Sequence, residues 1–172
     1  SQLGSGSKFT VKLKFNKSLS LEDSNNVNKE QSYKIDEFQN IKVLVVEDDF
    51  INQKIINNLL AKNKWDLTIA ANGDEVLELI KNNNYNLIIL DIYMPGIDGY
   101  EIAKKIRELE SKYGGYTPII AITATNTTEC REKCANIGFD EFIIKPIQEY
   151  EAYKKIISVI NKKANCDLIC LD

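Results

Sequence analysis

The chain of 172 residues contains no histidine. Any chemistry that needs an imidazole must therefore take it from another molecule or from another part of a longer protein. No apolar run approaches the roughly 18 residues that span a bilayer. The N-terminus also lacks the basic and then apolar pattern of a secretory signal. These absences argue against a membrane-spanning or secreted segment.

The charge balance is almost neutral, with a formal net charge of −3. It argues against a nucleic acid or an acidic membrane surface as the main partner. Hydrophobic residues make up 44% and charged residues 27%, which is ordinary for a globular protein large enough for one domain and some extra chain. Four cysteines without a secretory signal indicate reduced thiols, so we expect a cytoplasmic segment, whose parent protein can still be membrane-anchored.

The texture of the sequence predicts four regions. Residues 1–15 end in an alternation of apolar and polar residues that is typical of one strand. Residues 16–40 are rich in Asn, Ser, Lys and Glu and predict a polar linker. Residues 41–163 form the main domain, and residues 164–172 are a short tail that the pattern leaves unassigned.

The main domain alternates five short apolar runs with five helical patterns. The runs are 42–46, 66–71, 86–90, 118–123 and 141–145. Three helical patterns cover residues 50–62, 100–112 and about 149–162. A further pattern follows Asn72, which can cap it, and another follows Thr127 or Thr128 and ends before Gly138. This alternation predicts an α/β fold, a doubly wound five-stranded parallel sheet with helices on both faces and right-handed crossovers.

Chemically active side chains gather at the predicted strand ends. The first strand runs into Glu47 and Asp48, and the third into Asp91. The fourth ends at Thr123 and the fifth at Lys145. Because ligands of open α/β sheets bind outside the carboxyl ends of the strands, these residues should meet at one edge.

Carboxylates at such an edge repel one another. At about 4 Å the repulsion is roughly 4 kcal/mol per pair at an effective dielectric near 20. A cation between them allows them to stay ionised together, and a few hard oxygen ligands suit Mg²⁺. Lys145 can neutralise the remaining charge, and Asp49, beside the acidic pair, is better placed to cap the first helix.

With these strand ends, residues 42–162 resemble a response-regulator receiver domain. The motifs that carry the resemblance are VVEDD (45–49), LDIYMPGIDG (90–99), ITA (122–124) and the lysine of IIKP (143–146). The resemblance implies the flavodoxin-like strand order 2-1-3-4-5. It also implies that Asp91 is the phosphoacceptor, and that the Lys145–Pro146 peptide bond is cis.

The resemblance gives the other site residues their roles. Glu47, Asp48, Asp91 and the main-chain carbonyl of Tyr93 are implied to hold Mg²⁺. Lys145 is implied to pair with the phosphoryl group and to act in catalysis with Asp91. In the same way, Thr123 matches the switch hydroxyl of the family, and Phe142 matches its switch aromatic.

The implied activity is a phosphorelay receiver that takes a phosphoryl group from a phosphohistidine onto Asp91 and then changes conformation. Such a receiver promotes its own phosphorylation and dephosphorylation. Its partner would be a histidine-containing helical phosphotransfer or dimerisation domain, with Ile51 and Ile55 as candidate docking residues. Tyr93 and Thr125 are expected to obstruct the attacking water and to prolong the phosphorylated state. Nucleic acid and membrane contacts are not expected for this segment.

The N-terminal residues extend the resemblance to a second family. SQLGSGSKFTVKL (1–13) resembles the closing glycine-rich turn and strand of a histidine-kinase ATPase domain. A receiver directly downstream is the layout of a hybrid histidine kinase, so this chain would be the C-terminal part of such a phosphotransferase. The alternative is that GSGS is a cloning scar or a flexible linker.

Other functions stay open at this stage. A degenerate receiver would act only as a protein-interaction module, and an aspartyl-phosphate-type hydrolase usually has a second acid where Tyr93 stands. A nucleotide-binding domain fits poorly, because no glycine-rich loop follows the first strand. The spacings Cys130-x₃-Cys134 and Cys166-x₃-Cys170 allow a four-thiolate zinc site, although small buried or idle thiols are the better explanation.

Overall fold

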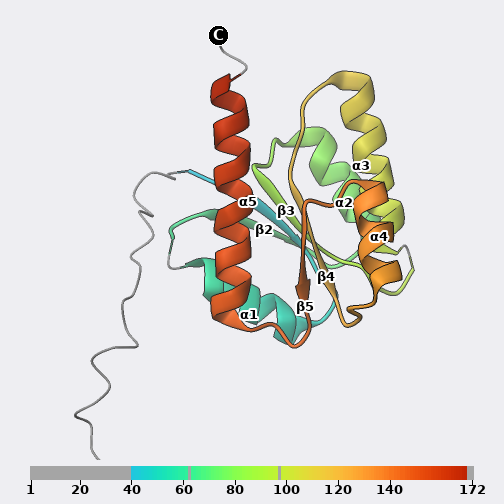
Figure 1. Cartoon of the computed structure of the whole chain (residues 1–172), viewed down its shortest axis with the longest axis vertical. Coiled ribbons are helices and arrows are strands. Elements are labelled where there is room, and N and C mark those ends of the chain that lie inside the picture. Colours follow the sequence, from blue (N-terminus) through green and yellow to red (C-terminus); the bar gives the residue numbers. More distant parts are fainter. Residues whose placement is uncertain (1–39, 62, 97, 170–172) are drawn as a thin grey trace, which may run out of the picture. The chain divides into compact units, whose positions relative to one another are not determined.

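The computed structural model describes residues 40–61, 63–96 and 98–169. The strand predicted within residues 1–15 and almost all of the predicted linker lie outside this range. In the described part, strands and helices alternate strictly from β1 to α5 (Figure 1). The five strands form one parallel sheet in the order β2-β1-β3-β4-β5. The predicted fold class and strand order are therefore confirmed.

The strands are short and, in the middle of the sheet, buried except for Lys42 at the start of β1. β1, β3 and β4 occupy the three central positions and carry almost only apolar residues, as parallel strands covered on both faces require. The five strands are β1 (Lys42–Val46), β2 (Asp66–Ala70), β3 (Leu87–Asp91), β4 (Ile119–Thr123) and β5 (Glu141–Ile144). Asp91 is thus the last residue of a strand whose five residues are all buried.

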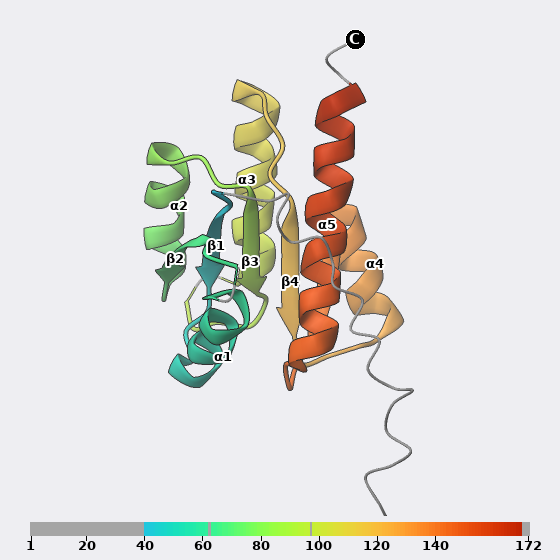
Figure 2. The ribbon, with the colours of Figure 1, turned by 90° about the vertical axis from the view of Figure 1, so that its left-hand side faces the viewer.

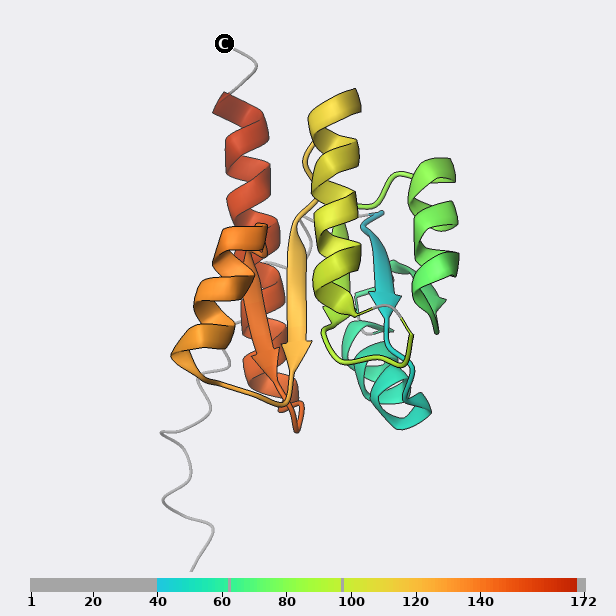
Figure 3. The same ribbon diagram turned by 90° about the vertical axis from the view of Figure 1, so that its right-hand side faces the viewer.

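The helices cover both faces of the sheet. α1 and α5 lie on one face (Figure 2), and α2, α3 and α4 lie on the other (Figure 3). The helices are α1 (Phe50–Ala61), α2 (Gly73–Asn82), α3 (Gly99–Tyr113), α4 (Thr128–Ile137) and α5 (Glu149–Ile169). Among the described residues, none of these helices combines the length and the apolar character that crossing a bilayer requires.

Local sequence signals explain where most helices begin and end. Asn72 accepts a hydrogen bond from the Glu75 amide and caps α2, and Thr127 does the same for α4, which decides between the two predicted threonines. Gly138 ends α4 with a left-handed φ of 99°, a conformation that glycine adopts without steric cost. The helical pattern therefore predicts these boundaries to within a residue or two.

The C-terminal boundary differs from the prediction. α5 was expected to end near Lys162, but it continues to Ile169, through most of the tail that the sequence pattern left unassigned. No glycine or proline follows to stop the helix before Ile169, and the backbone simply continues.

Candidate functional site

The predicted site residues that follow β1, end β3 and follow β5 come together at the carboxyl edge of the sheet. The Lys145 ammonium lies 2.6 Å from Asp91 Oδ2 and 3.0 Å from Glu47 Oε2. Carboxylate oxygens of Glu47, Asp48 and Asp91 all lie within 4.8 Å of one another. Lys145 therefore bridges two acids that are far apart in the sequence, as the strand-end argument predicts.

This cluster is largely removed from water. Glu47 is 0% and Asp91 is 1% exposed, whereas Asp48 lies at the surface. Burial raises the pKa of Glu47 above its usual value, and the nearby Asp91 raises it further, although the Lys145 ammonium works against both. Burial alone would lower the pKa of Lys145, but hydrogen bonds to Asp91 and Glu47 outweigh it and leave the pKa raised. The site thus holds more negative charge than its one ammonium balances.

The donor set fits a hard divalent cation. Three carboxylates converge, and the buried Glu47 Oε2 accepts no hydrogen bond from the described residues although Lys145 is 3.0 Å away. One ammonium does not balance three converging carboxylates, so a further cation would lower the cost of keeping them ionised. Oxygen ligands few in number, with one acid exposed to admit water, are the arrangement that suits Mg²⁺.

Two residues that the sequence analysis did not single out hold Glu47 in place. The Asn52 side chain donates to Glu47 Oε1 at 3.2 Å, and the Gln53 side chain donates to the Glu47 main-chain carbonyl at 2.7 Å. Both lie in the first turns of α1. That helix is capped as predicted, since Asp49 Oδ1 accepts hydrogen bonds from the amides of Ile51 and Asn52, each at 2.9 Å.

Gly99 fixes the other side of the site. A Cβ atom at this position would lie 2.3 Å from the Asp91 carbonyl oxygen, so only glycine permits α3 to start there. The Gly99 amide donates to the Ile92 carbonyl at 2.8 Å, and the Tyr93 amide donates to Asp91 Oδ1 at 3.1 Å. The loop after β3 therefore orients the Asp91 carboxylate through backbone groups.

The two predicted switch residues lie on neighbouring strands, Thr123 at the carboxyl end of β4 and Phe142 on β5 opposite Ala121. Thr123 is buried, and its hydroxyl exchanges hydrogen bonds with the Thr125 backbone, accepting from the amide at 3.0 Å and donating to the carbonyl at 3.3 Å. The Cys130 thiol lies 3.9 Å from the same hydroxyl. Phe142 is half-buried and packs against the core. The Lys145–Pro146 peptide bond is cis, which confirms that expectation.

The candidate docking residues and Tyr93, which is expected to obstruct the attacking water, differ in exposure. Ile51 is 67% exposed and Ile55 is half-buried, so only Ile51 presents most of its side chain to a partner. The Tyr93 ring is also largely exposed, close to Asp91 in the chain. Cys130 and Cys134 are buried reduced thiols, while the side chains of Cys166 and Cys170 lie outside the described part of the structure.

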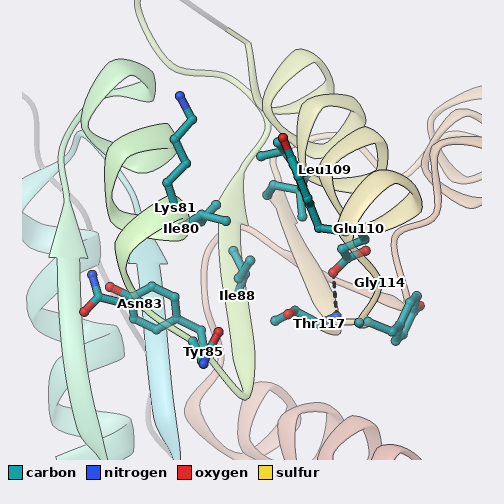
Figure 4. Close-up of a pocket in the computed structure, with 14 residues that line it drawn as sticks. Ile80, Lys81, Asn83, Tyr85, Ile88, Leu109, Glu110, Gly114 and Thr117 are labelled. Carbon is teal, nitrogen blue, oxygen red and sulfur yellow. Dashed lines mark hydrogen bonds between the residues drawn. The ribbon is translucent and has the colours of Figure 1, made fainter.

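One groove of the structure lies away from this site. It encloses about 510 Å³ at the opposite end of the strands, between the last turns of α2 and α3 (Figure 4). Tyr85, Ile88 and Leu109 contribute to its lining, and the Glu110 carboxylate there accepts a hydrogen bond from the Thr117 amide at 2.6 Å. This carboxylate is already paired, so the groove offers no cluster of reactive groups comparable with the acidic edge.

Fold and site together define a doubly wound α/β domain with an acidic, lysine-bridged centre at the carboxyl edge of its sheet. A family model described as the response regulator receiver domain matches residues 43–172. Since that match covers most of the chain, the chain belongs to the response regulator receiver family, whose members are receivers of two-component phosphorelay signalling.

Relatives of known description agree with this assignment. The chain is 41% identical over 126 residues to hybrid signal transduction histidine kinase I of Dictyostelium discoideum, covering 70% of this chain and 7% of that protein. It is 31% identical over 128 residues to the transcriptional regulatory protein ResD of Bacillus subtilis, covering 74% of this chain and 51% of ResD. The chain thus spans only a small fraction of the hybrid kinases it matches.

Solved structures show the same fold. One is the co-crystal structure of the Saccharomyces cerevisiae histidine phosphotransfer protein Ypd1 with the receiver domain of Ssk1, with a TM-score of 0.68, 32% identity and coverage of 74% of this chain and 93% of that chain. The receiver domain of Francisella response regulator 1452 matches with a TM-score of 0.65, 31% identity and coverage of 72% and 99%.

Proposed function

We propose that Asp91 accepts a phosphoryl group from a phosphohistidine, with Mg²⁺ held by Glu47, Asp48, Asp91 and the Tyr93 carbonyl. The observation that carries the proposal is the bridge from Lys145 to both Asp91 and Glu47, at 2.6 and 3.0 Å, in a cluster of three carboxylates. Such an arrangement concentrates positive charge where the oxygens of a transferred phosphoryl group would lie.

The reaction follows from these contacts. A carboxylate oxygen of Asp91 attacks phosphorus in line, an O–P bond forms, the P–N bond of the donor breaks, and the imidazole leaves. Bound Mg²⁺ would offset charge on the phosphoryl oxygens. The Lys145 ammonium moves its hydrogen bond from Asp91 to a phosphoryl oxygen, and the Tyr93 amide keeps Asp91 Oδ1 in place.

Phosphorylation then changes the neighbouring strands. The new phosphoryl oxygens attract the Thr123 hydroxyl, which leaves its hydrogen bonds with Thr125. Phe142 turns into the space that Thr123 vacates. The surface formed by α4 and β5 changes with it, and this change is the signal that a downstream partner reads.

The test is acetyl phosphate with Mg²⁺, followed by the intact mass of the full chain. We expect one added phosphoryl group, and none in Asp91→Asn or in the presence of EDTA. Asp49→Asn is the matched control, because Asp49 neighbours the acidic pair but serves as a helix cap. A full chain without a Mg²⁺-dependent adduct would favour a receiver that acts only through protein contacts.

The partner in this proposal is a histidine-bearing helical domain. Phe50 and Ile51 at the start of α1, Tyr93 after β3, and Tyr150 at the start of α5 expose large apolar side chains near the carboxyl edge of the sheet. A related receiver, that of Ssk1, has been crystallised with the phosphotransfer protein Ypd1. We therefore place the docking surface on these residues, with the parent chain a hybrid histidine kinase and the domain working in the cytoplasm.

Phosphorylated Ypd1 serves as the probe for docking. Ile51→Lys is expected to slow phosphoryl transfer from Ypd1 at least tenfold and to leave labelling by acetyl phosphate unchanged. Tyr113→Lys is the control, since Tyr113 is 73% exposed but lines the groove at the opposite end of the strands. Equal transfer rates in both variants and the parent would exclude Ile51 from the docking surface.

A further inference from the structure

Phe142 lies beside two positive charges from two different helices. The Arg131 guanidinium on α4 is 4.4 Å from the ring centroid, and the Lys155 ammonium on α5 is 4.3 Å from it. β5 is an edge strand, and α4 and α5 flank it on the two faces of the sheet (Figure 3). The ring is therefore attracted by a cation on each side of the strand that carries it.

Both cations are themselves held in position. Arg131 Nε donates to the Asn126 side-chain oxygen at 2.8 Å, within the loop that precedes α4. Lys155 donates to the main-chain carbonyl of Phe142 at 2.6 Å and pairs with Glu141 at 3.3 Å. An anchored cation has already lost much of its side-chain freedom, so its attraction for the ring costs little further entropy.

We propose that Arg131 and Lys155 are positioning residues that hold Phe142 in its present orientation and so set the cost of the conformational switch. The inference rests on the proposed function, in which Phe142 turns toward the site of Thr123 after phosphorylation. In the described conformation that space is taken, since the Thr123 hydroxyl is bound by Thr125 and lies against Cys130. Turning inward draws the ring away from both cations.

The size of the effect follows from the strength of such contacts. One cation–π contact at a partly exposed position shifts a two-state equilibrium by roughly two- to fivefold. Removing one cation should therefore raise the equilibrium constant for the inward orientation of Phe142 by two- to fivefold. Removing both should raise it by the product of the two factors if they act independently. A ligand that binds only the switched state would gain apparent affinity by the same factors.

The experiment uses the full chain, Mg²⁺ and beryllofluoride, a stable analogue of the phosphoryl group. The variants are Arg131→Met, Lys155→Met and the double variant, which keep long apolar side chains but remove the charge. Lys133→Met is the matched control, because Lys133 is also on α4 and lies 3.6 Å from the Tyr100 ring centroid, a contact that does not involve Phe142. Apparent affinity is measured by titration calorimetry.

A second readout follows Phe142 itself. The chain is labelled with 4-fluorophenylalanine, and the Phe142 signal in the ¹⁹F spectrum is assigned by its loss in Phe142→Leu. Without beryllofluoride, this signal should move toward its beryllofluoride-bound position in Arg131→Met and Lys155→Met, and stay in place in Lys133→Met. A merely structural role of the two cations would not produce that selective movement.

The outcomes separate the two proposals. If the parent chain binds no beryllofluoride and gives no Asp91 adduct, the proposed function fails. If the parent binds but the variants of Arg131 and Lys155 bind equally or more weakly, the positioning role is overturned while the proposed function stands. Two- to fivefold tighter binding in each single variant, with Lys133→Met within twofold of the parent, supports the positioning role.

Discussion

Replacing Glu47 with glutamine should stabilise the metal-free protein, because the acidic cluster is short of positive charge. At an effective dielectric near 20, the Lys145 ammonium at 3.0 Å attracts Glu47 by about 5.5 kcal/mol. Asp91, with a carboxylate oxygen within 4.8 Å, repels it by about 3.5 kcal/mol. The exposed Asp48 adds a smaller, screened repulsion.

The cost of burying the Glu47 charge decides whether the substitution stabilises or destabilises the protein. The attraction exceeds these repulsions by only about 1 to 2 kcal/mol, whereas burying an ion costs several kcal/mol in a real protein. Glutamine removes that cost and keeps an oxygen that can accept hydrogen bonds from the Asp49 amide and the Asn52 side chain. We expect Glu47→Gln to raise the free energy of unfolding in EDTA by about 1 to 3 kcal/mol.

The pH dependence provides a second signature. The pKa of Glu47 is raised in the folded state above the value of 4.5 expected when unfolded. The folded state therefore binds the proton more tightly, and the parent loses stability relative to the variant as pH rises from 4.5 through the folded-state pKa. Below 4.5 the difference is constant, because the carboxyl is protonated in both states.

In Mg²⁺ the parent should become more stable than Glu47→Gln. At a hundred times its dissociation constant, a ligand bound only to the folded state adds about 2.7 kcal/mol, and in the variant a neutral amide replaces one of the proposed carboxylate ligands. Urea unfolding followed by circular dichroism, in EDTA and in Mg²⁺, measures both effects, with the exposed Glu108→Gln as control. A variant that is less stable than the parent by about 3 kcal/mol in EDTA would show that the Lys145 pair dominates, and the charge argument would be refuted.

Three further predictions concern the surroundings of the site. Tyr93→Ala should shorten the half-life of the proposed acyl phosphate on Asp91, because the exposed Tyr93 ring, two residues after Asp91, is expected to obstruct the attacking water; an unchanged half-life rejects this. Gly99→Ala should lower the free energy of unfolding by about 3 kcal/mol or more, since its Cβ would lie 2.3 Å from the Asp91 carbonyl oxygen. A variant with the same free energy of unfolding as the parent would contradict this close approach. Burial raises the pKa of the Cys134 thiol to about 11 from 9.0, so its labelling at pH 8 should be about 100-fold slower than that of a free thiol, as mass spectrometry of the modified site will show.

The fold follows from the sequence because each local signal agrees with the others. β1 coincides with its predicted range, and the caps at Asp49, Asn72 and Thr127 lie where side-chain oxygens are available at helix starts. The convergence of Glu47 and Asp91 with Lys145 was predictable as well, because parallel strands carry their last residues to one edge.

Other features were not predictable, for physical reasons. Asn52 and Gln53 appear as ordinary polar residues of a surface helix, and their bonds to Glu47 depend on how α1 turns away from β1. The need for glycine at position 99 depends on the approach of α3 to the Asp91 backbone, a tertiary contact. Residues 164–172 are few and only partly apolar, so their pattern did not indicate that α5 continues to Ile169.

The two ends of the sheet show why only one of them is suited to phosphoryl chemistry. At the amino end, Arg107 lies among Glu110 and Asp140, and all four carboxylate oxygens accept a hydrogen bond from Arg107, Tyr116 or a backbone amide. That network also contains two acids and one cation, yet no oxygen lacks a donor, so it gains little from a metal ion. At the carboxyl end a third acid is added, and the one ammonium, that of Lys145, is shared between Glu47 and Asp91. The carboxyl end therefore holds more uncompensated negative charge than the amino end, and a bound cation would supply the positive charge that the carboxyl end lacks.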